Sequence, residues 1–285
     1  MSVTVARGRA FWLRFSGYLI AALSLFFAWR TLGIAADDFR AVAGAMQAWE
    51  LAMSGILFLL HGLLNAVAYG LMVRSFEPSY EAARGASAWS LSVLSKYVPG
   101  GVWMVVGRGA LLSADGLRTT TIVGSSLLEQ LVSLGACVLA ACLLLAIGQG
   151  ARPMSMALAG VAVLLAASCV PLLAARRFGI ESRRVYLASS VLYGIALLPY
   201  ALGYWLVVAP ADSMDFLLHL FTGTVAGVLA LIVPGGLGVR EAWVSVQSGP
   251  EGGSVLAAML FARLLILGSE CILMAGAAAF RGLSR

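Results

Sequence analysis

Six uninterrupted apolar runs dominate the sequence, and they constrain its fold more than any other feature. A helix that crosses the roughly 30 Å hydrocarbon core of a bilayer needs about 20 apolar residues. Only 11% of the chain is charged, against roughly 25% in soluble domains, and 61% is hydrophobic. The sequence therefore predicts an all-α integral membrane protein. The expected spans are residues 13–34, 48–73, 119–147, 153–175, 185–209 and 254–280.

Two further apolar segments, 86–112 and 213–247, are each interrupted by a Pro-Gly-Gly motif. The interruptions are Pro99-Gly100-Gly101 and Pro234-Gly235-Gly236. Proline removes a helical hydrogen bond and glycine weakens a helix, so we expect no continuous helix through either motif. Broken backbone at membrane depth is tolerated inside protein or beside a water-filled cavity. We predict two re-entrant helical hairpins; the alternative is a pair of kinked ordinary spans.

The distribution of arginine predicts the orientation in the membrane. If the six runs cross and the two hairpins return, twelve arginines lie on the side of the N-terminus and three on the other. Cytoplasmic loops carry the excess of positive charge, so we expect both termini in the cytoplasm and a bacterial-type inner (cytoplasmic) membrane. The twelve are Arg7, Arg9, Arg14, Arg74, Arg84, Arg118, Arg176, Arg177, Arg183, Arg184, Arg281 and Arg285. The net charge of +6 is not gathered into a surface for nucleic acid, so we predict no nucleic-acid partner.

The broken motif is repeated within the chain. Val98-Pro99-Gly100-Gly101 recurs 135 residues later as Val233-Pro234-Gly235-Gly236. Within the single membrane domain 1–285, we expect one repeat unit at 48–147, a linking helix at 153–175 and a second unit at 185–280. One intervening span would invert the second unit, which is the plan of many secondary transporters. Chance similarity between apolar helices is the alternative.

Residues around the two breaks are the first candidates for a binding site. The arm after each proline begins with free backbone N–H groups, which attract phosphate or carboxylate. The nearby basic residues Lys96, Arg108 and Arg240 suit the same anion. Lys96 is also placed to close the C-terminal end of a helical arm, and Arg240 with Glu241 could be an ordinary exposed pair. Tyr97 and Trp103 are candidates for the site or for interfacial packing.

Two charges lie deep within expected spans. Glu129 is about ten residues into its run and Arg263 about nine, which places both near mid-membrane. An uncompensated charge there costs about 2.5–3.5 kcal/mol on the lenient insertion scale, so each should face a partner or water. Either they form a structural ion pair, or they line a path for a lipid headgroup or a coupled proton. Glu270 lies on the same helical face as Arg263.

Enzymatic chemistry is not expected. The sequence contains no nucleophile elbow, no P-loop and no metal-ligand spacing, so we predict neither catalysis nor a cofactor. The four cysteines lie in apolar runs and are interpreted as packing residues. His61 and His219 are interpreted as residues at helix interfaces.

The ordered motifs resemble a known family. Ser95-Lys96-Tyr97-Val98-Pro99-Gly100-Gly101-Val102-Trp103, followed by Gly107-Arg108, resembles the signature of the flippase-like membrane domain of lysylphosphatidylglycerol synthases. Leu127-Leu128-Glu129, Pro234-Gly235-Gly236-Leu237-Gly238-Val239-Arg240-Glu241 and Arg263 resemble its later motifs. The resemblance implies movement of lipids or lipid-linked headgroups across the bilayer. The aminoacyl-transfer domain of the bifunctional members has no counterpart in these 285 residues.

The expected function is transbilayer transport of an anionic or phosphate-bearing lipid. A phospholipid and a polyprenyl-phosphate-linked lipid are both candidate cargoes. The alternative is a non-transporting scaffold or accessory subunit of a membrane enzyme that makes lipids or glycans. A second copy of the chain and such an enzyme are the candidate protein partners.

Overall fold

The computed structural model describes residues 36–97, 103–148, 179–210, 212–230 and 238–283, and all regular structure within them is helical. The expected spans 13–34 and 153–175 lie outside these residues. Both Pro-Gly-Gly motifs do as well.

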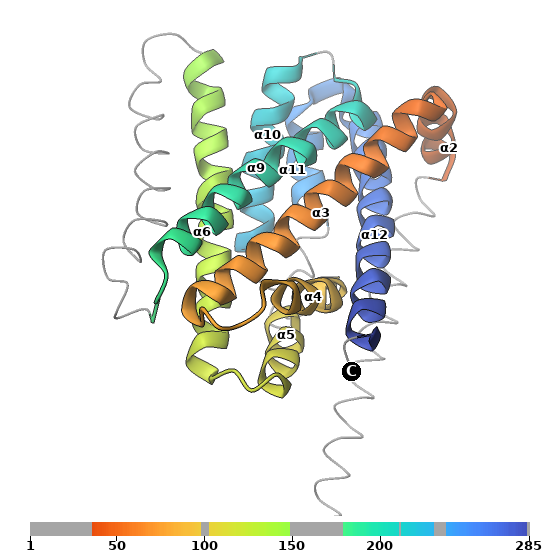
Figure 1. Ribbon diagram of the computed structural model, residues 1–285. Helices are drawn as coiled ribbons and strands as arrows, with labels where there is room; N and C mark the ends of the chain where they lie inside the picture. Colours follow the sequence, from red (N-terminus) through yellow and green to blue (C-terminus); the bar gives the residue numbers. More distant parts are fainter. Residues whose placement is uncertain (1–35, 98–102, 149–178, 211, 231–237, 284–285) are drawn as a thin grey trace, which may run out of the picture.

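Among the described residues, four helices are long and apolar enough to cross a membrane. They are α3 (Ala48–Phe76), α6 (Thr119–Gly148), α9 (Arg183–Val208) and α12 (Gly252–Leu283). At about 1.5 Å per residue each exceeds the thickness of the hydrocarbon core. They coincide with four of the six predicted spans. Figure 1 shows the four helices packed together in one bundle. The described part of the chain is therefore all-helical and contains four candidate membrane spans.

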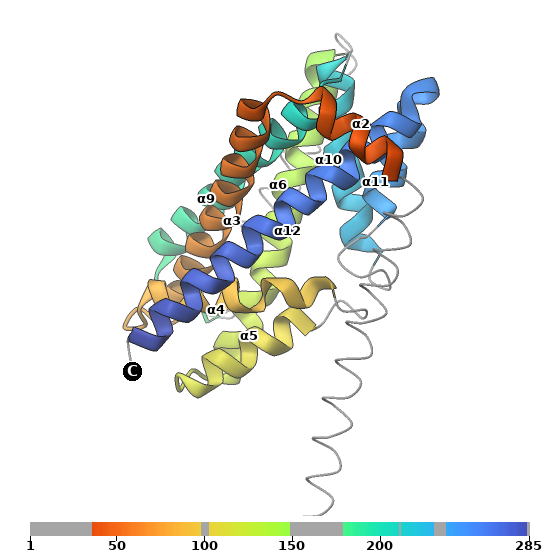
Figure 2. The same ribbon diagram turned by 90° about the vertical axis from the view of Figure 1, so that its right-hand side faces the viewer.

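Shorter helices flank the two interruptions. In the first, α4 (Ala82–Ser92) runs into the 3-10 helix η1 (Val93–Tyr97), and α5 (Trp103–Ala114) follows the break. In the second, α10 (Ser213–Leu229) precedes the break and α11 (Val239–Gln247) follows it. Figures 1 and 2 both place α4 and α5 toward one end of the molecule and α10 and α11 toward the other.

The long helices α3 and α9 form the centre of the packing. Glycine permits close approach between elements, as two positions illustrate. A Cβ atom on Gly203 would lie 2.7 Å from the ring of Phe58, and one on Gly70 would overlap the carbonyl oxygen of Ala82 at the start of α4. The short helices then pack on the long helix of the other half of the chain: α4 lies against α12, and α10 lies against α6.

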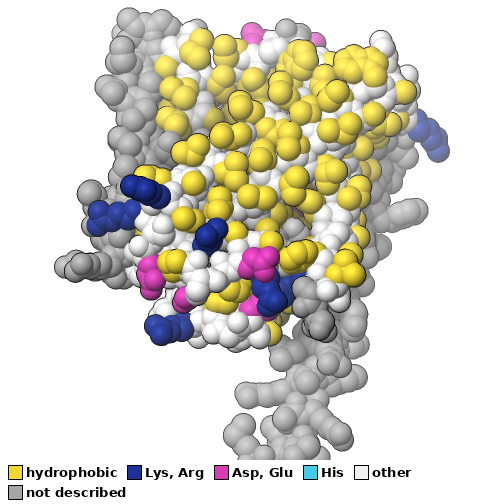
Figure 3. Space-filling model, in the orientation of Figure 1, with side chains coloured by type: hydrophobic (Ala, Val, Ile, Leu, Met, Phe, Trp, Pro, Cys, Tyr) yellow, Lys and Arg dark blue, Asp and Glu magenta, His cyan; other side chains and the backbone are white. Residues whose placement is uncertain are grey.

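The outward surfaces of the long helices are apolar. Ile56, Val191, Leu198 and Ile272 are each more than half exposed. Figure 3 shows a broad field of hydrophobic side chains, with most charged side chains gathered toward one end of the molecule. A soluble protein rarely exposes so large an apolar patch, so this surface fits contact with lipid.

Polar contacts connect the C-terminal end of α5 to the C-terminal end of α12. Tyr80 donates to the Asp115 carboxylate over 2.6 Å, and Arg281 approaches the same oxygen at 3.1 Å. Arg281 also donates to the Ser87 hydroxyl and the Arg84 carbonyl oxygen on α4. Burial and the neighbouring Asp115 carboxylate raise the pKa of Tyr80 above its usual range, because both disfavour the phenolate.

Candidate functional site

A cavity of about 440 Å³ lies among the long helices and the two interrupted segments. Its wall draws residues from α3, α4, η1, α5, α6, α9, α10, α11 and α12. Most of the lining is apolar or aromatic, which is the usual character of a ligand site. Among the described residues, the charged ones that line it are Lys96, Glu129, Arg240, Arg263 and Glu270.

The first charged cluster joins α5 to α6. Arg108 is completely buried and forms a salt bridge with Glu129. The indole nitrogen of Trp89 donates to the other Glu129 oxygen over 2.8 Å, and the Arg108 guanidinium lies 4.2 Å from the centre of the Tyr69 ring. A buried carboxylate requires such partners because water no longer solvates it. Glu129 of α6 is thus held by side chains from α4 and α5, and it also lines the cavity.

The second cluster is centred on Glu241 at the start of α11. Its carboxylate accepts from Arg240 at 2.6 Å and from Arg263 of α12 at 2.7 Å. The other oxygen accepts from the backbone N–H of Gly238 at 2.9 Å, which caps the helix. Gly238 has φ of +84°, a conformation that glycine adopts without steric cost. Arg240 also donates to the Tyr200 hydroxyl over 2.6 Å, which aims its guanidinium toward α9.

A third pair joins the end of the first arm to α12. Lys96 of η1 forms a salt bridge with Glu270, whose side chain is 6% exposed. The Lys96 ammonium lies 5.2 Å from the centre of the Tyr97 ring, and the Arg263 guanidinium lies 5.5 Å from the same ring. Both cations therefore lie close enough to the Tyr97 ring for a favourable cation–π contact.

Glu129 and Arg263 do not form an ion pair with each other. Glu129 pairs with Arg108, and Arg263 pairs with Glu241. Both residues line the same cavity. The ion pairs are formed instead between each long helix and the short helix just before it in the chain.

The structure brings together most of the predicted site residues that it describes. Lys96, Tyr97, Glu129, Arg240 and Arg263 line the cavity, and Arg108 and Glu241 hold its charged residues in place. Trp103 begins α5 and is half-buried, and it is not among the lining residues. The remaining six predicted residues lie outside the described ranges: Pro99, Gly100, Gly101, Pro234, Gly235 and Gly236.

Several lining residues were not predicted as site residues. His61 donates from Nδ1 to the carbonyl oxygen of Ala196 over 2.7 Å, and Asn65 stands one turn away on α3. Trp89 and Tyr200 reach the wall as partners of Glu129 and Arg240. Polar residues in an apolar span were the available signal for His61 and Asn65. The aromatic partners of the charged residues carried no such signal, because an aromatic residue in an apolar helix is usually a packing residue.

Some buried polar atoms of these clusters have no hydrogen-bond partner among the described residues. They are Arg108 Nη2, Arg240 Nε, the Tyr204 hydroxyl and Glu270 Oε2. A buried donor without a partner costs about 1–3 kcal/mol. Arg240 Nε and the Tyr204 hydroxyl belong to neighbouring side chains, since the guanidinium lies 5.0 Å from the Tyr204 ring centre. Arg240 lines the cavity, and its Nε is a donor that an anionic oxygen would satisfy.

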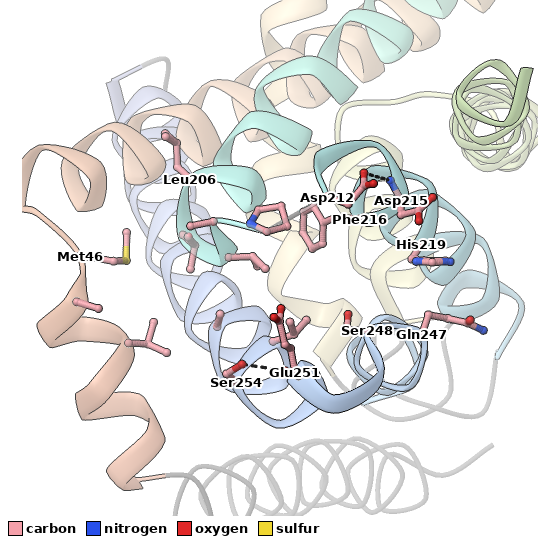
Figure 4. A pocket seen from close by; sticks show the side chains of 18 of the residues that line it. Met46, Leu206, Asp212, Asp215, Phe216, His219, Gln247, Ser248, Glu251 and Ser254 are labelled. Atoms are coloured by element: carbon pink, nitrogen blue, oxygen red, sulfur yellow. Dashed lines mark hydrogen bonds between the residues drawn. The ribbon is translucent and has the colours of Figure 1, made fainter. Parts of the chain in front are cut away.

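A second cavity, of about 550 Å³, opens between α2 (Ala36–Ala45), α10 and α12. Figure 4 shows acidic side chains around it, including Asp212, Asp215 and Glu251. Asp212 is the N-cap of α10 and accepts from the N–H groups of Met214 and Asp215. Helix capping accounts for this carboxylate. The basic and aromatic cavity is therefore the stronger candidate for binding an anion.

Comparisons with known proteins identify no family for the chain. A scan against models of protein families finds no match, and a search of curated proteins finds no significant similarity.

Proposed function

We propose that this protein moves an anionic lipid with a phosphate-bearing headgroup between the two leaflets of a membrane. The observation that carries the proposal is the cavity among the candidate spans, whose apolar wall holds Lys96, Arg240 and Arg263. Such a site offers a charged headgroup a polar path while the acyl or prenyl chains stay in the surrounding lipid. The resemblance of the broken motifs to a flippase-like domain favours the same function.

A charged headgroup needs such a polar path because lipid solvates charge poorly. A charge taken through the centre of a bilayer costs several kcal/mol or more without protein partners. Arg240 offers a guanidinium held by Glu241 and Tyr200, with Nε left unsatisfied by described residues. Guanidinium groups bind phosphate with charge-assisted hydrogen bonds. A headgroup that enters the cavity exchanges its hydrogen bonds with water for hydrogen bonds with these donors. The free-energy barrier to crossing the bilayer is therefore lower than in lipid alone.

The proposed architecture is an inverted repeat of six spans and two re-entrant hairpins. Its support is the correspondence of positions between the two halves. Arg108 and Glu129 correspond to Glu241 and Arg263 at offsets of 133 and 134, so each half has a buried ion pair with its signs reversed. Tyr69 corresponds to Tyr204 at an offset of 135. The reciprocal packing of α4 on α12 and of α10 on α6 also fits a two-fold relation.

An inverted repeat suits alternating exposure of one site to two faces. Two structurally similar halves can exchange conformations, which opens the same cavity first to one leaflet and then to the other. The charge-reversed pairs would keep each hairpin attached to its own long helix during that exchange, because a buried pair is costly to separate. The headgroup site between them then stays assembled in both states.

Transport is tested with the purified full chain in vesicles. Fluorescent phosphatidylglycerol is placed in both leaflets, and a membrane-impermeant reductant quenches the outer label. Transport predicts loss of the signal beyond the outer half in vesicles that contain the protein, and a stable inner half in vesicles that contain an unrelated membrane protein. Equal stability in both samples, for phosphatidylglycerol and for polyprenyl-linked lipids, contradicts the proposal and favours a scaffold.

A further inference from the structure

The charges around the cavity do not balance. Four cations, Lys96, Arg108, Arg240 and Arg263, line it or hold its lining residues, against the three carboxylates of Glu129, Glu241 and Glu270. With histidine neutral, the described residues leave a surplus of one positive charge. The segments 98–102 and 231–237, which contain the two breaks, have no ionisable side chain in their sequence and do not alter this count.

The surplus has a definite position. Glu129 is matched by Arg108 and Glu270 by Lys96, whereas Glu241 is shared between Arg240 and Arg263. The extra positive charge is thus at the Glu241 cluster, on the side of the cavity formed by α9, α11 and α12. Arg240 Nε, which has no hydrogen-bond partner among the described residues, belongs to this cluster and to a residue that lines the cavity.

The chemistry of phosphate then distinguishes two kinds of headgroup. A phosphodiester has one negative charge at neutral pH, whereas a phosphomonoester has about 1.5 to 2 because its second pKa is near 6. A ligand with one negative charge neutralises the surplus positive charge of the site. A ligand with two negative charges leaves one of them unpaired, which is costly where the dielectric constant is low. The neighbouring carboxylate of Glu241 would repel that second charge.

We propose that the cavity takes lipid headgroups joined through a phosphodiester, with a single negative charge, in preference to phosphomonoesters. This inference rests on the proposed function and narrows its substrate. A glycerophospholipid and a glycosylated polyprenyl phosphate both present this group. Bare polyprenyl phosphate and phosphatidic acid do not.

The test compares matched lipids in vesicles at about pH 8, where the monoester is close to doubly charged. One pair is fluorescent phosphatidylglycerol with fluorescent phosphatidic acid, and the other is a polyprenyl phosphosugar with its polyprenyl phosphate. The full chain should move the diester at least about tenfold faster in whichever lipid class it carries. A monoester that moves as fast as its diester overturns the charge-matching inference and leaves transport standing. No movement of any of the four lipids contradicts the proposed function itself.

Variants of the acidic residues test the cause of the preference. Glu270→Gln and Glu241→Gln each raise the surplus from one to two, so each should shift the ratio of rates about tenfold toward the monoester. Glu270 is the milder site, since its partner Lys96 is 30% exposed and can be solvated. The ratio of rates can therefore be measured in Glu270→Gln even if Glu241→Gln does not fold. Arg74→Gln, at an exposed position near the end of α3, is the matched control and should leave the ratio unchanged. An unchanged ratio in the folded acidic variants contradicts the inference.

Discussion

His61 on α3 donates a hydrogen bond to the carbonyl oxygen of Ala196 on α9, and 135 residues separate the two. The same offset separates Pro99 from Pro234. When a two-fold axis relates two units, a residue meets its own counterpart only close to that axis. The contact therefore fits an axis that passes through the crossing of α3 and α9, beside the cavity that His61 lines.

The proposed inverted repeat predicts how the two hairpin tips are reached from solvent. Single cysteines at Gly100 and Gly235, in a background without the native cysteines, should react with membrane-impermeant reagents from opposite faces of the membrane. The reason is that one intervening span would invert the second unit in the proposed architecture. Labelling in sealed vesicles and in inverted vesicles measures this. Labelling of both tips from one face rules out the inverted repeat.

The buried pair of Arg108 and Glu129 predicts a non-additive effect on stability. Glu129→Leu leaves Arg108 buried without its counter-charge and should lower the free energy of unfolding by about 3–5 kcal/mol. Adding Arg108→Met removes the stranded charge and should recover much of that loss. Unfolding in detergent, measured for both single variants and the double variant, gives the coupling energy. Simple additivity would mean that the salt bridge contributes little.

A double-mutant cycle on Glu129 and Arg263 is the comparison for the cycle on Arg108 and Glu129. Because Glu129 and Arg263 belong to different ion pairs, the losses from Glu129→Leu and Arg263→Met should add to within about 0.5 kcal/mol in the double variant. A large coupling between them, comparable with that of Arg108 and Glu129, would show that the two clusters act as one unit.

Close packing of α4 on α3 predicts a sharp contrast between two glycines of the same helix. Gly70→Ala places a methyl group against the Ala82 carbonyl oxygen and should destabilise the fold by about 1–3 kcal/mol. Gly55→Ala meets no atom within 4 Å and should stabilise α3 by about 0.5–1 kcal/mol. Thermal unfolding of both variants checks the contrast. Equal effects would mean that α4 does not rely on this close approach.

Hydrophobicity alone predicted four of the long helices closely. The expected run 48–73 corresponds to α3 and the run 119–147 to α6, because burying apolar residues in lipid leaves few alternatives to a continuous helix. For segment 213–247, α10 ends at Leu229 and α11 begins at Val239, on either side of Pro234-Gly235-Gly236 as the sequence predicted. The interruption of segment 86–112 at Pro99-Gly100-Gly101 lies outside the described residues and stays a prediction. Spans 13–34 and 153–175 and the hairpin geometry stay predictions.

The charged site was predictable as a set of residues and not as a set of pairs. Depth in a span identified Glu129 and Arg263 as buried charges, because an isolated charge in lipid is costly. Their partners depend on how the short helices return against the long ones. Sequence spacing therefore did not reveal that Arg108 faces Glu129 or that Glu270 faces Lys96. Tertiary packing also placed His61 and Tyr200 at the wall.

The most direct test of the account is the transport rate of Arg240→Gln beside that of Arg74→Gln, with thermal unfolding of both. Arg240 holds the surplus positive charge at the cavity, whereas Arg74 is exposed near the end of α3. The account predicts that Arg240→Gln stays folded and moves anionic lipid at least about tenfold more slowly, whereas Arg74→Gln transports at the unmodified rate. An Arg240→Gln protein that is folded and transports anionic lipid at the unmodified rate would contradict the anion site.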